Sequence, residues 1–300
     1  MKLLLAAVLF STPALSQGLV LSANAGQFAA EDTSIESLGF KGVFGPLTLS
    51  QTRVALELGA VQSSGNTYGV AWRQEWNSRS TTELSYDYSA YDDSYSAHSV
   101  GLKHSFWVWE DTLQFLVGGN RVEVFQDSIT VLRDDLREVV IPSRSDTNTA
   151  TVGLSWLASP FLVLEGSLLG RQAKHEPVTK GGEGKAKVFV KNLHSALHLT
   201  GAYLTRSGNT DESQHGDMTS KRFEGAWVAA PWLGAEIVVS YRRYYETESL
   251  YEDRSYASDL ALLSVAQTLS YVTVGAEAGL YKNSDDLLGR HYAVTLSVEL

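Results

Sequence analysis

The chain has 300 residues, of which 44% are hydrophobic and 19% charged, and its mean hydropathy is -0.10. Past residue 20, no apolar run approaches the roughly 18 residues that a spanning helix needs, which excludes a polytopic helical membrane protein. The net charge of -10 argues against nucleic acid as a partner, and the absence of cysteine excludes disulfides and thiolate metal sites.

The N-terminal residues have the features of an export signal. Lys2 supplies a positive charge, residues 3–10 form a short apolar core, and a small-residue sequence ends at Ser16. We expect cleavage after Ser16, and a second small-residue sequence leaves cleavage after Ala25 as an alternative. The prediction is a signal peptide over residues 1–16 and an exported, acidic mature chain.

Residues 17–47 have a mixed pattern that indicates neither a helix nor a strand. We expect this N-terminal segment to trail into the periplasm or to enter the lumen of a barrel. One alternative stays open, because Gly39–Gly45 resembles the later segment Lys185–Val190 and would then form an extra strand.

From residue 48 onward, apolar residues alternate with small or polar residues in segments of about ten, each followed by turn residues. The last segment is the clearest, with Tyr292, Val294, Leu296, Val298 and Leu300 on one face. Earlier apolar faces include Val54, Leu56 and Leu58, then Tyr68, Val70 and Trp72, and later Ala235, Ile237 and Val239. A tilted strand of about 9 to 11 residues crosses a bilayer, so the pattern predicts an all-β fold of transmembrane strands.

The connections between these segments alternate in length. Short turns are expected at 77–80, 109–111, 158–160, 191–192, 230–233 and 266–268, and longer or more polar connections at 63–66, 91–96, 126–145, 173–184, 206–217, 247–254 and 282–289. Tight periplasmic turns and longer external loops are typical of bacterial outer-membrane barrels. Residues 48–300 are therefore predicted to form a transmembrane antiparallel up-and-down β-barrel of about 14 strands, within a range of roughly 12 to 16.

The aromatic residues support this topology. Most tryptophans lie within a few residues of the short turns: Trp76, Trp107, Trp109, Trp156, Trp227 and Trp232. Most tyrosines lie towards the longer connections: Tyr68, Tyr86, Tyr88, Tyr91, Tyr95, Tyr241, Tyr244, Tyr245, Tyr251, Tyr256 and Tyr281. Two aromatic girdles are expected where amphipathic rings meet the two membrane interfaces.

The segment LELGAVQSSGNT, residues 56–67, and the aromatic-rich strand after it resemble the YdiY-like family of outer-membrane proteins, often called salt-induced. This resemblance implies an outer-membrane barrel and supplies no catalytic residues. The last strand resembles the C-terminal signal that the outer-membrane assembly machinery recognises, although it ends in Leu300 where Phe is usual.

If the apolar faces contact lipid, the opposite faces line the lumen. The charged or titratable residues predicted there are Arg53, Glu57, Arg73, Glu75, Glu83, Asp87, Lys103, Glu165, Arg171, His198, Arg222, Glu224, Glu236, Arg242, Glu277 and Glu299. They predict a porin-like channel for passive diffusion of small hydrophilic solutes or ions, with a mild cation preference. The alternative is a structural or adhesive barrel, in which Arg and Glu pair to brace a closed lumen and the loops form a binding surface.

The long connection 126–145 has a strand-like pattern of its own. Apolar segments after Ser128 and Leu136 flank Asp134-Asp135 as two strands flank a tight turn. We expect a hairpin that protrudes above the membrane, with an inward-folded constriction as the alternative.

Enzyme and metal chemistry find little support in the pattern. A lipid hydrolase needs His and Ser two residues apart on one strand face, whereas His98-Ser99, His104-Ser105 and His194-Ser195 are adjacent and so face opposite ways. An omptin-like protease would need carboxylates and a His at the external rim, and no such spacing is present. No catalytic residue, metal site or cofactor is therefore expected. The expected partners are outer-membrane lipid, lipopolysaccharide, the assembly machinery and small solutes or ions.

Overall fold

The computed structural model describes residues 19–30, 33–58, 61–91, 95–109, 111–126, 129–132, 138–141, 144–173, 177–190, 194–208, 217–249, 253–284 and 287–299. The predicted signal peptide, residues 1–16, lies outside the described residues. The described part of the chain contains no helix that is long and apolar enough to cross a membrane.

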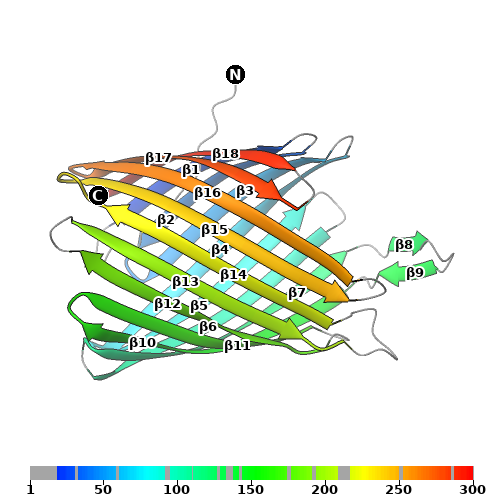
Figure 1. Ribbon diagram of the computed structural model, residues 1–300, viewed down its shortest axis with the longest axis horizontal. Coiled ribbons are helices and arrows are strands. Elements are labelled where there is room, and N and C mark those ends of the chain that lie inside the picture. Colours follow the sequence, from blue (N-terminus) through cyan, green and yellow to red (C-terminus); the bar gives the residue numbers. More distant parts are fainter. Residues whose placement is uncertain are drawn as a thin grey trace.

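Within the described residues, 16 antiparallel strands close into one barrel (Figure 1). Each wall strand pairs with the wall strands before and after it in the chain, so β7 pairs with β10, and β1 closes the wall by pairing with β18. The wall strands are β1 (Leu19–Ala30), β2 (Thr33–Phe44), β3 (Leu47–Leu58), β4 (Val61–Asn77), β5 (Ser80–Tyr91), β6 (Tyr95–Trp109), β7 (Leu113–Gln126), β10 (Arg144–Ser159), β11 (Leu162–Ala173), β12 (Thr179–Val190), β13 (Ser195–Arg206), β14 (Asp217–Ala229), β15 (Ala235–Ser249), β16 (Asp253–Leu269), β17 (Val272–Asn283) and β18 (Leu288–Glu299). The predicted all-β, up-and-down barrel is confirmed.

The predicted strand number is too low by the two N-terminal strands. The segment 17–47, expected in the periplasm or the lumen, supplies β1 and β2, and β1 pairs with both β2 and β18. The outer face of β1 consists mainly of small residues after Leu21, namely Ala23, Ala25 and Ala29, so its alternation is weak. The alternative cleavage site after Ala25 would cut this strand in the middle.

The two ends of the barrel differ. At the end that we call the turn end, two-residue turns such as Gly45-Pro46 join strands, and β1 begins beside the last residues of β18. The opposite end carries the connections expected to be long, but several are short because the strands continue into them. Residues 63–66 belong to β4, and residues 179–184 belong to β12.

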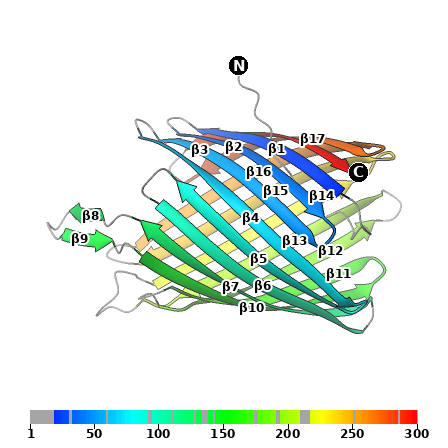
Figure 2. The same cartoon turned by 180° about the vertical axis from the view of Figure 1, so that it is seen from behind.

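A separate two-stranded sheet lies beyond this opposite end. Strands β8 (Ile129–Leu132) and β9 (Glu138–Ile141) pair with each other and are not part of the wall. They extend away from the barrel rather than into it, in both views (Figures 1 and 2). The predicted hairpin is therefore confirmed as a protrusion. We call the end of the barrel that carries it the hairpin end.

The wall has no central packed core. Among the described residues, the buried hydrophobic side chains are all alanines, and no large side chain is fully buried. Large apolar side chains are instead exposed on the outside of the wall, as with Leu168 at 72% and Trp72 at 47%. Such an apolar outer surface is stable in contact with lipid rather than with water. Transmembrane barrels have this arrangement.

Candidate functional site

The strand register assigns each side chain to one of two faces, because directly paired residues lie on the same face of a sheet. Trp72, Leu84 and Leu102 form one apolar row across β4, β5 and β6. The next positions, Arg73, Glu83 and Lys103, form a charged row on the other face. A cavity of about 580 Å³ is lined mainly by residues of this second face, which is therefore the inner one.

Most of the charges predicted for the lumen lie on this inner face. The register places there Arg73, Glu75, Glu83, Asp87, Lys103, Glu165, Arg171, Arg222, Glu224, Glu236, Arg242 and Glu277. They come from two groups of strands, β4 to β6 and β11 to β15, with Glu277 on β17 between these groups.

The prediction for Arg53 and Glu57 is wrong. Both lie on the outer face of β3, because Arg53 pairs with Leu38 and Asn66, and Glu57 pairs with Ser34 and Gln62. The end of β3 reverses the usual polarity: its outer face is polar near the hairpin end, and its inner face carries Val54 and Leu56. Apolar residues mark the outer face only in the band of the wall whose outer surface is apolar. Residues 53–57 lie beyond that band, towards the hairpin end.

The inner face of β11 to β15, which we call the charged wall, carries a chain of ion pairs. Lys187 Nζ lies 2.8 Å from Glu165 Oε1, and Lys185 Nζ lies 2.8 Å from Glu183 Oε1. Arg222 also pairs with Glu183, so this carboxylate holds two cations. Two further pairs continue the series, namely Arg242–Glu224 at 2.9 Å and Arg206–Glu248 at 2.5 Å.

These pairs run along the wall. Arg242 and Glu224 lie on adjacent strands, and Arg222 and Glu183 are separated by one strand. Within the described part of the chain, every segment is a wall strand, a connection at a strand end, or the β8–β9 hairpin. These charge pairs therefore join the strands on one side of the lumen to one another.

The inner face on the far side, over β18 and β1 to β3, is mainly small and polar. Its residues include Thr295, Ser297, Ser22, Asn24, Ser37, Gly39, Ser50 and Thr52. The carboxylate Glu277 on β17 is engaged locally, because it accepts a hydrogen bond from Ser264 at 2.5 Å and contacts His291 at 2.8 Å. The lumen is thus charged on one side and lined by short polar side chains on the other.

His198 and Glu299, also predicted for the lumen, lie on the inner face too. Several inner-face charges were missing from the prediction: Lys41, Glu183, Lys185, Lys187, Arg206, Glu246 and Glu248. Most of them lie near strand ends, or on strands in which apolar and polar residues alternate only weakly. On β12, the sequence KGGEGKAKVFV places glycines between the charges, and a strict every-second-residue test for charge would have found Glu183, Lys185 and Lys187.

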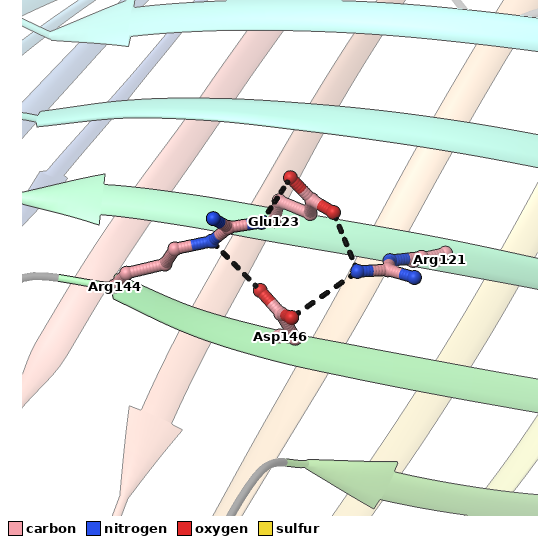
Figure 3. Close-up of polar contacts among 4 residues, drawn as sticks. All are labelled: Arg121, Glu123, Arg144 and Asp146. Carbon is pink, nitrogen blue, oxygen red and sulfur yellow. Dashed lines mark hydrogen bonds and ion pairs between the residues drawn. The ribbon is translucent and has the colours of Figure 1, made fainter.

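A second charged cluster lies on the outer face, near the base of the hairpin (Figure 3). Arg121 and Glu123 of β7 face Arg144 and Asp146 of β10, and we call these four residues the outer charge ring. Arg121 Nη2 lies 2.6 Å from Glu123 and 3.2 Å from Asp146. Arg144 lies 3.0 Å from Glu123 and 3.4 Å from Asp146. Each guanidinium therefore contacts both carboxylates.

The described residues contain no group of three or more His, Asp or Glu side chains that could hold a metal ion. The adjacent His and Ser residues of β6 lie on opposite faces, since His98 pairs with Tyr88 on the outside and Ser99 pairs with Asp87 on the inside. This arrangement brings no nucleophile to a base on that strand.

Comparison with known proteins identifies the fold. No protein-family model matches the chain, and no curated protein matches it. The chain is similar to a bacterial polysaccharide outer membrane secretin, with a TM-score of 0.59, 10% identity, and coverage of 94% of this chain and 98% of the other. It is also similar to CdiB from Acinetobacter baumannii, with a TM-score of 0.64 and 10% identity, covering 95% of this chain and 60% of CdiB.

A third similar structure is the outer membrane protein opdK from Pseudomonas aeruginosa, with a TM-score of 0.54, 9% identity, and coverage of 95% and 99%. This chain has the fold of an outer-membrane β-barrel. At such low identity the likeness extends to the fold alone.

Proposed function

We propose that the chain spans the outer membrane of a Gram-negative cell and forms a channel for passive diffusion of small hydrophilic solutes or ions. The turn end would face the periplasm and the hairpin end the exterior. The observation that carries this proposal is the combination of a 16-stranded closed wall with a charged inner face that no described segment crosses. Barrels of 16 to 18 strands leave an aqueous channel, whereas barrels of about eight strands are filled by side chains.

The inner face supports a mild preference for cations. Its described acidic residues are Glu75, Glu83, Asp87, Glu165, Glu183, Glu224, Glu236, Glu246, Glu248, Glu277 and Glu299. The basic residues with described side chains there are Lys41, Arg73, Lys103, Arg171, Lys185, Lys187, Arg206, Arg222 and Arg242. The acidic residues outnumber the basic ones slightly, and a ring of charges of one sign favours passage of the opposite sign.

The barrel's interaction with the assembly machinery and its kinship with the YdiY-like family stay predictions. The first rests on the alternation of the last strand, and the second on residues 56–67. Export with a cleaved signal peptide likewise rests on the sequence pattern of residues 1–16.

The decisive experiment is single-channel conductance of the refolded mature chain in a planar bilayer, with the reversal potential measured in a salt gradient. We expect stable conductance steps and a reversal potential biased towards cations. Arg73→Ala removes an inner-face cation that contacts Glu75 at 3.4 Å, so the variant should be more cation-selective. Lys221→Ala, on the outer face of β14, makes the same charge change outside the lumen and should leave selectivity unchanged.

A silent bilayer, from protein shown to be folded by its heat-dependent gel migration, would contradict the channel. It would favour the alternative of a closed structural or adhesive barrel. In that case Arg73→Ala would lower stability without any effect on ion passage.

A further inference from the structure

The inner-face cavity of about 580 Å³ is a trough that runs over β7 and β10, and we call it the polar trough. Its volume lies within the range of about 300 to 1,000 Å³ that ligand pockets occupy. The floor of the trough consists of four directly paired positions of the two strands, none of them charged. These pairs are Gln114–Ser155, Leu116–Gly153, Gly118–Thr151 and Asn120–Thr149.

Charged residues border the polar trough on both sides. One edge, on β5 and β6, carries Glu83 and Lys103. The other edge, on β11 and β12, carries Glu165, Glu183 and Lys185. Both carboxylates of the second edge already contact cations of the charged wall at 2.8 Å. The lining therefore has three carboxylates and two ammonium groups around an uncharged floor, which favours an uncharged solute over an anion.

The floor is rich in groups that both donate and accept hydrogen bonds. They belong to Gln114, Asn120, Thr149, Thr151 and Ser155. Within the described residues, Asn120 Nδ2 donates to Ser99 Oγ at 3.1 Å, and the other four side chains make no hydrogen bond to the wall. Hydroxyl groups also donate and accept, so a solute with several hydroxyls matches this floor.

Trp107 adds an aromatic ring at the turn end of the trough. The other six tryptophans are between 43% and 66% exposed, whereas Trp107 is half-buried. Trp107 was expected in the aromatic girdle, but it pairs with Gln114 and so lies on the inner face. Leu116 is the next inner-face position along β7. The trough therefore has an apolar corner beside its polar floor.

We propose that the polar trough binds a short neutral saccharide. The C–H face of one sugar ring would pack on Trp107, because the face of an aromatic ring is electronegative and C–H groups are weakly positive. Gln114 and Thr151 would hydrogen-bond the ring hydroxyls, and Glu83 would accept from further hydroxyls at the edge. This inference rests on the proposed function and deepens it, since it names the class of solute that the channel admits.

A saccharide fits the trough better than a nucleoside does. Among the described residues that line or border the trough, Trp107 supplies one ring, whereas a base is held best between two stacking surfaces. A nucleobase also presents few hydroxyls to the five floor side chains. The arrangement of the floor thus favours many hydrogen bonds and one ring contact.

Saturation-transfer NMR of the refolded mature chain tests this inference. The detergent is lauryldimethylamine oxide, which has no sugar headgroup to compete for the trough. The probes are four neutral disaccharides, namely maltose, cellobiose, lactose and sucrose. Uridine and digalacturonate serve as comparison solutes. We expect a saturable signal from at least one neutral disaccharide, and a weaker one from both comparison solutes.

The first test variant is Trp107→Ala, and its matched control is Trp109→Ala. Trp109 is 63% exposed and pairs with Leu113 on the outer face, so the control removes a tryptophan near the same turn without reaching the trough. We expect Trp107→Ala to weaken disaccharide binding about two- to tenfold, whereas Trp109→Ala should bind like the wild type.

The second test variant is Thr151→Val, which removes a floor hydroxyl and keeps the shape of the side chain. Its control is Thr52→Val, the same change on the inner face of β3, away from the trough. Loss of one hydrogen bond should weaken binding about two- to tenfold in Thr151→Val, and Thr52→Val should leave it unchanged.

Absence of a saturable signal from all four disaccharides would overturn the proposal, as would equal affinity of Trp107→Ala and the wild type. Tighter binding of uridine or digalacturonate would overturn the choice of a neutral saccharide. If Trp107→Ala lacks the heat-dependent gel migration of a folded barrel, Trp107→Leu provides a milder test with the same expected direction. Conductance is measured separately. A silent barrel that binds disaccharides would contradict the channel alone, and a conducting barrel that binds none would contradict this site alone.

Discussion

The outer charge ring should stabilise the barrel where the wall continues into the hairpin, and Glu123→Gln tests this directly. Glu123 contacts Arg121 at 2.6 Å and Arg144 at 3.0 Å, so one substitution removes two ion pairs and keeps the shape of the side chain. Its side chain is 27% exposed, whereas both arginines are about half exposed, at 52% and 50%. The arginines can therefore be hydrated again when the carboxylate is lost.

The expected loss follows from these exposures. An exposed ion pair contributes about 0.2 to 1 kcal/mol, and the larger value applies to pairs in networks with good geometry. Removal of two pairs at a partly buried carboxylate should lower the free energy of unfolding by about 1 to 2 kcal/mol. Salt screens exposed charges, so the difference should shrink in about 1 M salt.

The assay is equilibrium urea unfolding of the barrel in lipid vesicles, followed by tryptophan fluorescence at low and high salt. Glu36→Gln, on the outer face of β2, is the matched control and should change stability little. A double-mutant cycle of Glu123→Gln with Arg144→Leu should give a coupling energy of about 0.5 to 1 kcal/mol. A loss below about 0.3 kcal/mol, or a loss that salt does not reduce, would refute the reasoning, since the ring would then contribute no electrostatic stability.

Two further predictions concern the hairpin and the wall. Deletion of residues 129–140 should leave single-channel conductance nearly unchanged, because the hairpin lies outside the barrel, and a large rise would show that it constricts the lumen. Gly181→Ala should destabilise the barrel by about 1 to 3 kcal/mol in urea unfolding, because its Cβ would lie 2.1 Å from the backbone oxygen of Tyr203. Gly184→Ala on the same strand has no atom within 4 Å of its Cβ and should be tolerated, and equal effects of the two variants would contradict this reasoning.

The part of the fold that follows from the sequence is the part with strong alternation. All strands from β3 to β18 in the wall arise from residue 47 onward, where apolar and small or polar residues alternate. The first two strands could not be found in this way. On β2 the outer face includes Ser34, Glu36 and Gly42, so its polarity matches that of the inner face over half its length.

The lumen charges were predictable wherever the opposite face of the strand was apolar. Glu83 and Lys103 are flanked by Leu84 and Leu102, and the sequence alone separates their faces. Arg53 was assigned to the inner face because Val54 and Leu56 follow it in an apolar alternation. Pairing of Arg53 with Leu38 across β2 and β3 fixes the opposite assignment, and the sequence of one strand contains no information about that register.

The ion pairs of the charged wall bear on both candidate states of the lumen, the open channel and the closed barrel braced by ion pairs. Ion pairs that brace the barrel obstruct the passage of solutes only if oppositely charged side chains meet across the lumen. Here Lys187 pairs with Glu165 on the adjacent strand, and Arg222 reaches Glu183 two strands away on the same side. Pairs of this kind join neighbouring strands and hold long side chains against the wall, which limits their reach into the lumen.

Bracing of this type is therefore compatible with the proposed channel. Loss of a pair such as Arg242–Glu224 would release two long side chains from the wall, while the net charge of the lumen depends only on which partner is removed. Arg242→Gln should thus increase cation selectivity, and Glu224→Gln should decrease it, although both break the same 2.9 Å contact. Reversal potentials that shift in opposite directions for these two variants, with similar losses of stability, would show that one set of ion pairs supports the wall and sets the selectivity. Shifts in the same direction would refute this account, because the selectivity would then depend on wall rigidity rather than on lumen charge.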